Sequence, residues 1–470
     1  MGSGDEIITN SYDPAVSAEL ATFMATGWDA PVTCAPDVAA LPFTAFTAAR
    51  RSALADAFAG TTIAVCAGTA PWRNGDQHHL HRSSSEFLFL VGAHRGADEL
   101  ENAVLVLQSG TATLFAPAPT VAGTAEHWRD RTAGGLWVGH RPALADLAAR
   151  LQLEVAPLSE LEGCLAGITG EIALVGGTAP ALLTAIGRGP VSADVVQYLD
   201  TARLTKDPYE IGELRRAVAA TELAFEDLAR ELTPGVRERW LEGSFSRRAR
   251  SEGDAMGYHP IVAAGSHACV LHWMRNDGIV GVDDLLLVDA GVELESGYTA
   301  DVTRVLPASG RFSPVQRRVY DAVREAQAAG VAAVVPGAGF YDPHMAAMQV
   351  VCEHLADWGV LQVTPAEALE RGVHRRWTLH GSSHMLGLDV HDCSEARDEL
   401  YSGGSLAENY VLTVEPGVYF QPDDLTVPDE LRGIGVRIED DVLVTSIGHE
   451  NLSEALPRDI LAVEQWMAAL

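Results

Sequence analysis

The stretch from 283 to 307, DDLLLVDAGVELESGYTADVTRVLP, constrains the fold most, because it sets aspartates among apolar and β-branched residues. It predicts a β-hairpin in which one strand ends at Asp289, the chain turns near Glu295, and a second strand returns through Asp301. If Glu295 is the centre of the turn, the two aspartates oppose each other with Cβ atoms ~5 Å apart. Either aspartate alone suits a turn or cap, but two buried carboxylates this close repel each other unless a proton or cation lies between them. A pair of metal ions is the expectation that follows.

Two glutamates raise the same question in other strands. VLTVEPGVYF (411–420) and GVRIEDDVLVT (435–445) are predicted strands by their β-branched residues. Glu415 lies in the middle of an apolar strand, where burying an unpaired charge costs several kcal/mol. Glu439 repeats the anomaly, although it could instead pair with Arg437, which shares its strand face. The neighbouring Asp440 and Asp441 are expected to face solvent.

The segment TLHGSSHMLGLDVHD (378–392) adds three histidines, His380, His384 and His391. The first two are four residues apart, which would suit one face of a helix, as in the HExxH zinc motif. Gly381 and the missing glutamate argue against that motif. Four carboxylates with one imidazole make an oxygen-rich donor set that suits two divalent ions, Mn²⁺, Co²⁺ or Zn²⁺, with water between them. A structural zinc site would instead use cysteines.

Charge and composition restrict the partners. The chain has 470 residues, a formal net charge of −31, 47% hydrophobic residues and 21% charged residues. Such a negative protein is not expected to bind nucleic acid or an anionic membrane, and a small molecule or peptide is the better substrate class. The six scattered cysteines, the lack of an apolar run of ~18 residues and the lack of an export signal predict a cytoplasmic protein.

The length and the pattern of elements predict two domains in an α/β (α+β) chain, residues 1–200 and 201–470. In the first domain, strands are expected at 61–68, 86–92, 102–110 and 112–119, with helices at 44–60 and 141–151. In the second, Asp207 and Pro208 predict the start of a long helix that ends at 233–235. Ser313 and Gln316 predict a second helix that opens with a capping box.

The order of five motifs resembles the "pita-bread" metallopeptidases of family M24, and within them the aminopeptidase P group. These motifs are DAG (289–291), TADVTR (299–304), HGSSHMLGLDVHD (380–392), TVEPGVYF (413–420) and GVRIEDD (435–441). The resemblance covers about 205–470 and implies a pita-bread catalytic domain. It extends more weakly to HRSSSEFLFLVG (81–92) in the N-terminal domain, where Ser85 and Glu86 replace the family's commoner aspartate before phenylalanine.

The resemblance also assigns site residues. It implies that the metal ligands are Asp289, Asp301, His384, Glu415 and Glu439, and that Asp301 and Glu439 touch both metals. It places further site residues at His272, His380, His391 and Arg437. On residue pattern alone, His272 between Leu271 and Trp273 would be a core histidine. Trp273 stands where the family often has tyrosine, so a difference in the pocket wall is expected.

The resemblance implies release of the N-terminal residue from peptides with proline at the second position. Two divalent ions, with Mn²⁺ expected first, would generate hydroxide from a bridging water, and Glu415 would carry its proton to the proline nitrogen. His380 and His391, with pKa values near normal, would stabilise the oxyanion or bind the peptide carbonyl. Arg437 would anchor a carboxylate of the site. The alternatives are a prolidase that cleaves Xaa-Pro dipeptides and a binding protein without catalysis. A homo-oligomer, dimer or tetramer, is also expected by the resemblance.

Overall fold

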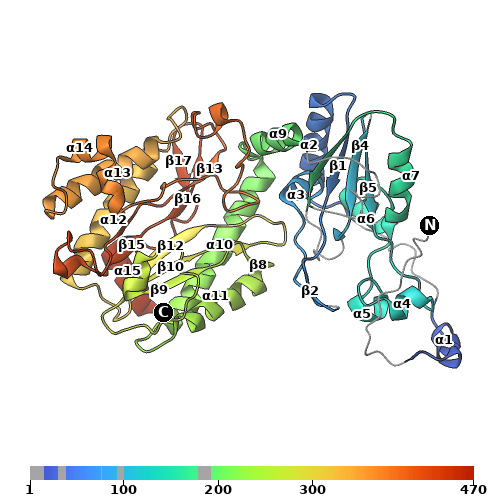
Figure 1. Ribbon diagram of the computed structural model, residues 1–470, viewed down its shortest axis with the longest axis horizontal. Coiled ribbons are helices and arrows are strands. Elements are labelled where there is room, and N and C mark those ends of the chain that lie inside the picture. The colour runs from blue at the N-terminus through green and yellow to red at the C-terminus, as the bar shows by residue number, and fades with distance from the viewer. Residues whose placement is uncertain (1–14, 30–38, 76, 93–99, 109, 178–191) are drawn as a thin grey trace. The chain divides into compact units, whose positions relative to one another are not determined.

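The structure is a computed structural model (Figure 1) that describes residues 15–29, 39–75, 77–92, 100–108, 110–177 and 192–470. The chain divides into two compact units, Met1–Val196 and Gln197–Leu470. Helix α9 (Ala193–Arg203) crosses this division, and the boundary expected from the sequence falls in the same helix. Within the described ranges, no helix is both long and apolar enough to pass through a bilayer. The expected mixed α/β fold is confirmed.

The first unit is built on a mixed five-stranded sheet of order β6-β5-β4-β1-β7. Strands β1 and β7 pair in parallel, as do β5 and β6, whereas β4 is antiparallel to both β1 and β5. Its strands are β1 (Thr62–Cys66), β4 (Val104–Gln108), β5 (Thr111–Ala116), β6 (Glu154–Pro157) and β7 (Ile172–Gly176), beside a small hairpin of β2 (Trp72–Asn74) and β3 (Gln77–His78). Its helices are α1 (Ala18–Met24), α2 (Thr44–Ala57), α3 (Ser85–Val91), α4 (Ala125–Arg129), α5 (Gly135–Val138), α6 (Leu144–Leu151) and α7 (Leu161–Ala166).

The predicted strand at 86–92 is wrong, because this segment is the helix α3. Ser84 caps the helix, since its hydroxyl accepts the Phe87 N–H at 3.3 Å. Every residue of α3 from Phe87 to Val91 is buried, so the segment shows neither the alternation of a strand nor the stripe of a surface helix. Short apolar runs of this kind cannot be assigned by periodicity. The other strands and helices predicted in this unit are present.

The second unit places strands between two groups of helices. Figure 1 shows α10 and α11 on one side of the strands and α12, α13 and α14 on the other. Both predicted capping boxes are confirmed, at Asp207 and Glu210 for α10 and at Ser313 and Gln316 for α12. The helices are α10 (Pro208–Glu231), α11 (Glu238–Glu252), α12 (Pro314–Ala333), α13 (Asp342–Asp357), α14 (Pro365–Arg371) and α15 (Ile460–Ala469).

Four small sheets form the strand layer of the second unit. Their orders are β12-β10-β9, β11-β8, β13-β16-β17 and β14-β15. The strands are β8 (Ala255–Met256), β9 (Ile261–Ala264), β10 (Leu285–Ala290), β11 (Val292–Glu293), β12 (Val302–Pro307), β13 (Val411–Val414), β14 (Gly417–Tyr419), β15 (Gly435–Arg437), β16 (Asp440–Val444) and β17 (His449–Asn451). The two long strands predicted at 411–420 and 435–445 are therefore each broken in two.

The hairpin at 283–307 forms, but the predicted register is wrong. Asp289 pairs with Thr303, not with Asp301, because the turn is centred on Ser296. Asp301 lies just before β12, two positions from Thr303 and thus diagonal to Asp289. A shift by two positions keeps side chains on the same face, so the two aspartates still share it, at diagonal and not direct spacing.

A buried arginine joins the two halves of this strand layer. Arg304 on β12 is 1% exposed and donates to an oxygen of Asp440 on β16 at 2.7 Å and to the Glu439 carbonyl at 2.6 Å. It also donates to the carbonyls of Ser453 and Leu456. The expectation that Asp440 and Asp441 face solvent is wrong, because both are fully buried. Burial would raise the pKa of Asp440, but Arg304 and Arg458 together lower it below its ordinary value.

Replacing Arg304 by methionine is expected to lower the free energy of unfolding by about 3–5 kcal/mol, because the variant leaves the buried carboxylate of Asp440 without one of its cationic partners. The pKa of Asp440 is lowered in the folded protein, so its ion pair stabilises the fold fully above the ordinary aspartate pKa. This stabilisation is lost as the pH falls through the lowered pKa of the folded protein. Urea denaturation of both proteins across this pH range measures the difference. The control is R215M, which removes the exposed Arg215–Glu450 pair and should change stability by less than about 1 kcal/mol. Equal losses in the two variants would contradict this role of Arg304.

Candidate metal centre

A cavity of about 680 Å³ in the second unit collects every site residue predicted from the sequence. Those residues are His272, Asp289, Asp301, His380, His384, His391, Glu415, Arg437 and Glu439. A larger hollow of about 810 Å³, which includes Asp284 and Arg311 in its lining, contains none of them. The predicted site residues are therefore gathered in the smaller of these two cavities.

The two aspartates of the hairpin are linked by a tyrosine. The Tyr258 hydroxyl contacts Asp289 Oδ1 at 2.8 Å and also contacts Asp301 Oδ1. Asp301 is 5% exposed, and its backbone N–H donates to Asp441 at 3.1 Å. A phenol has one proton to donate, so it satisfies only part of the acceptor capacity of two carboxylates. Asp289 Oδ2 also accepts from Arg437, whereas Asp301 Oδ2 faces His384 and is the oxygen of the pair best placed to meet a cation.

The two glutamates lie where the predicted strands break. Glu415 stands with Pro416 between β13 and β14, and Glu439 stands between β15 and β16. Thr303 holds Glu439 from the hairpin, since its hydroxyl donates to the glutamate at 2.6 Å and its carbonyl accepts the Glu439 N–H at 3.2 Å. The breaks leave both carboxylates directed into the cavity instead of along a strand face.

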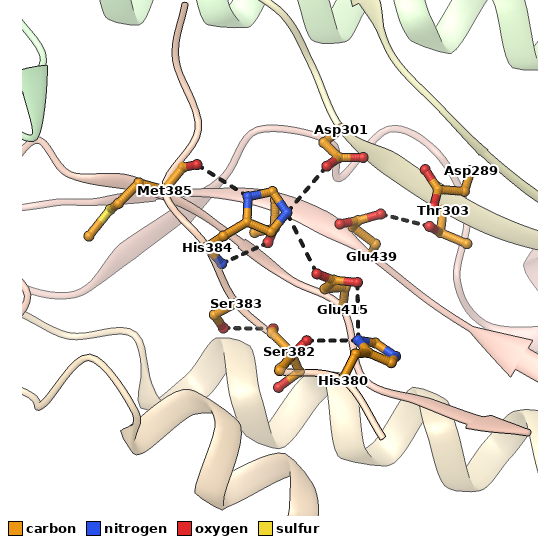
Figure 2. A network of polar contacts seen from close by, with 12 residues as sticks. Asp289, Asp301, Thr303, His380, Ser382, Ser383, His384, Met385, Glu415 and Glu439 are labelled. Carbon is orange, nitrogen blue, oxygen red and sulfur yellow. Dashed lines mark hydrogen bonds and ion pairs between the residues drawn. The ribbon is translucent and has the colours of Figure 1, made fainter. Parts of the chain in front are cut away.

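His384 is the imidazole that lies among the carboxylates. Figure 2 shows its ring between Asp301 and Glu415, with Nε2 at 3.4 Å from the aspartate and 3.6 Å from the glutamate. Its Nδ1 lies 3.2 Å from the Met385 carbonyl, which fixes the Nδ1–H tautomer and leaves Nε2 as the ligand atom. Asp301, His384 and Glu439 each offer one ligand atom, and these three atoms lie within 4.8 Å of one another.

The pKa values record the crowding of negative charge. Burial raises the pKa of Glu415 to about 7, against the opposing effect of His384 and Arg437. Burial and neighbouring carboxylates also raise the pKa of Glu439 well above its ordinary value, and burial raises that of Asp289. Burial would lower the pKa of His384, but Asp301 and Glu415 raise it to about 9. Without a cation, these groups would have to share protons.

Arg437, Tyr419 and His380 form a hydrogen-bonded chain beside the ligands. Arg437 donates to Asp289 at 2.5 Å and to the Tyr419 hydroxyl at 2.9 Å, and that hydroxyl lies 2.8 Å from His380 Nε2. His380 Nδ1 lies 2.7 Å from the Gly381 carbonyl and 3.6 Å from Glu415. The alternative pairing of Glu439 with Arg437 is not found, because the guanidinium bonds to Asp289, Tyr419 and Thr303.

The expectation of normal histidine pKa values is wrong for both residues to which it was applied. Burial, together with Arg437, lowers the pKa of His380 to about 4. Burial and the nearby His384 lower the pKa of His391, whose ring centroid is 4.4 Å from that of His384. Both imidazoles are therefore neutral near pH 7. Both nitrogens of His380 already have partners within the protein.

His272 and His391 are exposed to the cavity, so the core alternative for His272 is wrong. The expectation that Trp273 changes the pocket wall is wrong, because this residue is buried and does not line the cavity. Leu271 and Met274, on either side of that pair, line the cavity together with Ile261, Leu379 and Val390.

Sequence reasoning missed Tyr258, which bridges two ligands, and the supporting roles of Thr303 and Tyr419. Tyr258 lies in GDAMGYHPIV, where nothing in the local pattern separates it from a core tyrosine. Thr303 could have been found from the sequence, because in the correct register it lies opposite Asp289, and its hydroxyl would then face the same site.

The donor set fits divalent cations. It contains four carboxylates and one imidazole with an oriented tautomer, in a cavity where Arg437 is already engaged by Asp289. Oxygen-rich sets of this kind hold Mn²⁺, Co²⁺ or Zn²⁺. The five predicted ligands therefore converge on one place that can hold metal.

Comparisons with known proteins agree with this geometry. Residues 212–446 match the family model "Metallopeptidase family M24", and residues 47–173 match "Aminopeptidase P, N-terminal domain". Xaa-Pro aminopeptidase 1 of Streptomyces coelicolor is 46% identical, covering 98% of this chain and 94% of the relative. The Xaa-Pro aminopeptidase of Escherichia coli is 32% identical over 89% of this chain and 97% of its own length.

Solved structures give the same result. Aminopeptidase PepP of Pseudomonas aeruginosa aligns with a TM-score of 0.81 at 30% identity, covering 92% of this chain and 99% of that one. Aminopeptidase P of E. coli, solved with the inhibitor Pro-Leu, aligns with a TM-score of 0.78 at 28% identity, covering 91% and 98%. A zinc-substituted form of the E. coli enzyme in complex with product aligns equally well. The expected family and fold are confirmed: the chain belongs to metallopeptidase family M24, and its first unit carries the N-terminal domain of aminopeptidase P.

Proposed function

We propose that this protein is an Xaa-Pro aminopeptidase, which releases the N-terminal residue from peptides with proline at the second position. The observation that carries the proposal is the convergence of Asp289, Asp301, His384, Glu415 and Glu439 on one cavity. The relatives that match nearly the whole chain are Xaa-Pro aminopeptidases. Domains at 1–200 and 201–470 are part of the proposal, with the metal site in the second.

Those five residues would hold two divalent ions, of which Mn²⁺ is proposed first and Co²⁺ or Zn²⁺ next. When bound, the ions would supply Lewis acidity and lower the pKa of a bound water. By the resemblance to family M24, Asp301 and Glu439 are proposed as the ligands that both ions would share; one ligand atom from each lies within 4.8 Å of the other and of one from His384. Tyr258, Thr303 and Arg437 orient the carboxylates through the hydrogen bonds that they donate.

The other residues divide the work of peptide cleavage. Glu415 has one oxygen beside His384 and the other beside His380, so it stands between the ligands and the rest of the cavity. It would carry a proton to the proline nitrogen, which lacks an N–H of its own and must be protonated to leave. His272 and His391 would donate to the peptide carbonyl, since no described residue forms a hydrogen bond with either ring. Arg437 and Tyr419 would hold the His380 ring in place, and this ring would in turn limit the orientations of Glu415 beside it.

A catalytically silent binding protein is the alternative from another class, but nothing on the site favours it, because all five ligand positions carry ligand residues. Assembly into a dimer or tetramer and a location in the cytoplasm stay predictions from the sequence.

Replacing Glu415 by alanine is expected to lower kcat on an Xaa-Pro-Yaa tripeptide by at least about 10²-fold, because the variant lacks the proposed proton carrier. The measurement is steady-state kinetics together with metal content, which separates loss of the proton carrier from loss of metal. E408A, at an exposed glutamate on the same unit, is the matched control and should keep the parent kcat. An unchanged kcat in E415A would remove this residue from the mechanism.

Chelation should abolish activity, and Mn²⁺ should restore it more fully than Co²⁺ or Zn²⁺. Removal of the ions leaves buried carboxylates facing one another, so the thermal midpoint should also fall and should rise again with metal concentration. Elemental analysis of the active protein should give two ions per chain. Full activity with less than one ion per chain would contradict the dinuclear proposal.

Substrate length separates an aminopeptidase from a prolidase. The protein is expected to cleave an Xaa-Pro-Yaa tripeptide and longer peptides, with an Xaa-Ala-Yaa peptide as the control that shows the need for proline. Initial rates are measured by the release of the first amino acid. Hydrolysis of the Xaa-Pro dipeptide alone would favour the prolidase alternative.

A further inference from the structure

Glu238 is a fully buried carboxylate outside the metal centre. It is the first residue of α11, and its side chain is 0% exposed. An isolated buried carboxylate is costly, so its position requires hydrogen bonds that offset the lost hydration. The partners of Glu238 come from one segment, residues 264–278, which carries His272 at its centre.

Four donors surround the carboxylate. Oε1 accepts the Ala264 N–H at 2.8 Å and faces His267 Nδ1 at 2.7 Å. Oε2 accepts the indole N–H of Trp273 at 2.9 Å and the Gly278 N–H at 2.7 Å. An ionised carboxylate can accept four such bonds and donates none, so Glu238 is matched to this set of donors. It therefore ties the start, the middle and the end of the segment to one point.

Trp273 connects Glu238 to the residue that faces the cavity, His272. The Trp273 ring stacks on His267 with centroids 3.8 Å apart, and the Arg275 guanidinium lies 4.2 Å over it. The preceding residue, His272, is exposed to the cavity, whereas Trp273 is buried against Glu238. A tight turn, with the Met274 N–H donating to the His272 carbonyl at 3.0 Å, fixes the backbone between the two side chains.

Gly278 shows how close this packing is. A side-chain carbon at Gly278 would lie 2.7 Å from Glu238 Oε1 and 2.6 Å from the His267 ring, so only glycine fits there. The segment is also anchored from the other side, because the Asn276 side chain accepts the Val262 N–H and donates to the Pro260 carbonyl, each at 3.0 Å. Both ends of the segment are thus held, and the indole bond fixes the position between them.

We propose that Glu238 is a positioning residue that sets the direction of His272 in the cavity through the indole N–H of Trp273 and the anchored segment 264–278. The inference rests on the proposed function, because the direction of His272 has an effect on turnover only if this cavity binds a peptide.

The principal variant is Glu238→Gln. Its amide keeps the size of glutamate, but the NH₂ group cannot accept, so it would face the Ala264 N–H in one orientation and the Trp273 and Gly278 N–H groups in the other. We expect kcat/KM on an Xaa-Pro-Yaa tripeptide to fall by about tenfold or more, since small misplacements of a site residue cost one to two orders of magnitude. Trp273→Phe removes a single donor and keeps an aromatic ring, so its loss of kcat/KM should be smaller. This variant replaces Glu238→Gln as the test if Glu238→Gln does not fold.

Glu231→Gln is the matched control. Glu231 ends α10 and accepts the indole N–H of Trp240 on α11 at 2.5 Å, so it makes another glutamate–tryptophan bond with neither residue in the cavity lining. This variant should keep the kcat and KM of the parent protein.

A second pair of variants separates positioning from general stability. In a His272→Ala background, Glu238→Gln should cost less than about twofold further, because residues that act through one another are not additive. The same fold-loss in both backgrounds would overturn the proposal.

Amide hydrogen exchange supplies a readout that does not depend on activity. Exchange in 265–278 should rise in Glu238→Gln and stay unchanged in Glu231→Gln. An unmodified protein that cleaves no Xaa-Pro peptide would end the proposed function, whereas an active protein whose Glu238→Gln variant has unaltered kcat/KM and exchange would end this inference alone.

Discussion

Mutual repulsion among buried carboxylates is the constraint on which the second unit depends. Four of them, Asp289, Asp301, Glu415 and Glu439, face one cavity, while Arg437 and His384 carry at most two positive charges toward them. Hydroxyl donors from Tyr258 and Thr303 reduce the imbalance but cannot remove it. A fold that keeps these groups together needs cations, so metal binding and folding are expected to be coupled in this unit.

The strand layer is shaped by the same requirement. A glutamate in a regular strand alternates with its neighbours and faces one side of the sheet. Glu415 and Glu439 instead lie at breaks between short strands, and Pro416 lies in the first break, where a residue without an N–H interrupts the ladder. Arg304 stabilises the second break, because its guanidinium donates to the Glu439 carbonyl, which lies outside the flanking strands. Local irregularity is thus supported by a buried charge pair with Asp440.

The sequence predicted well what is encoded locally and poorly what depends on distant partners. The helix starts at Asp207 and Ser313 followed from capping residues, and the proposed metal ligands followed from the order of motifs. The hairpin register failed because nothing in ELESGY distinguishes a turn centred on Glu295 from one centred on Ser296. Tyr258 and Glu238 were missed because their partners lie 26 to 43 residues away, and no periodic pattern connects them. The burial of Asp440 and Asp441 was missed for the same reason.

The direction of the pKa shift separates two kinds of buried acid. Burial alone raises the pKa of a carboxyl group, and only a nearby cation or several donors reverse it. Asp392 beside Arg203 and Lys206, and Asp440 beside Arg304 and Arg458, have lowered pKa values, because an internal cation already pairs with each of them. Burial raises the pKa values of Glu415 and Glu439, and the neighbouring carboxylates of Asp301 and Asp289 raise them further, against the opposing effect of Arg437. The pKa of Asp441 is raised as well, mainly by burial. This residue does not line the cavity, but one of its carboxylate oxygens accepts the Asp301 N–H. The raised pKa favours the protonated, neutral form of Asp441, and a cation held by Asp301 would lower this pKa by offsetting the charge of that neighbour.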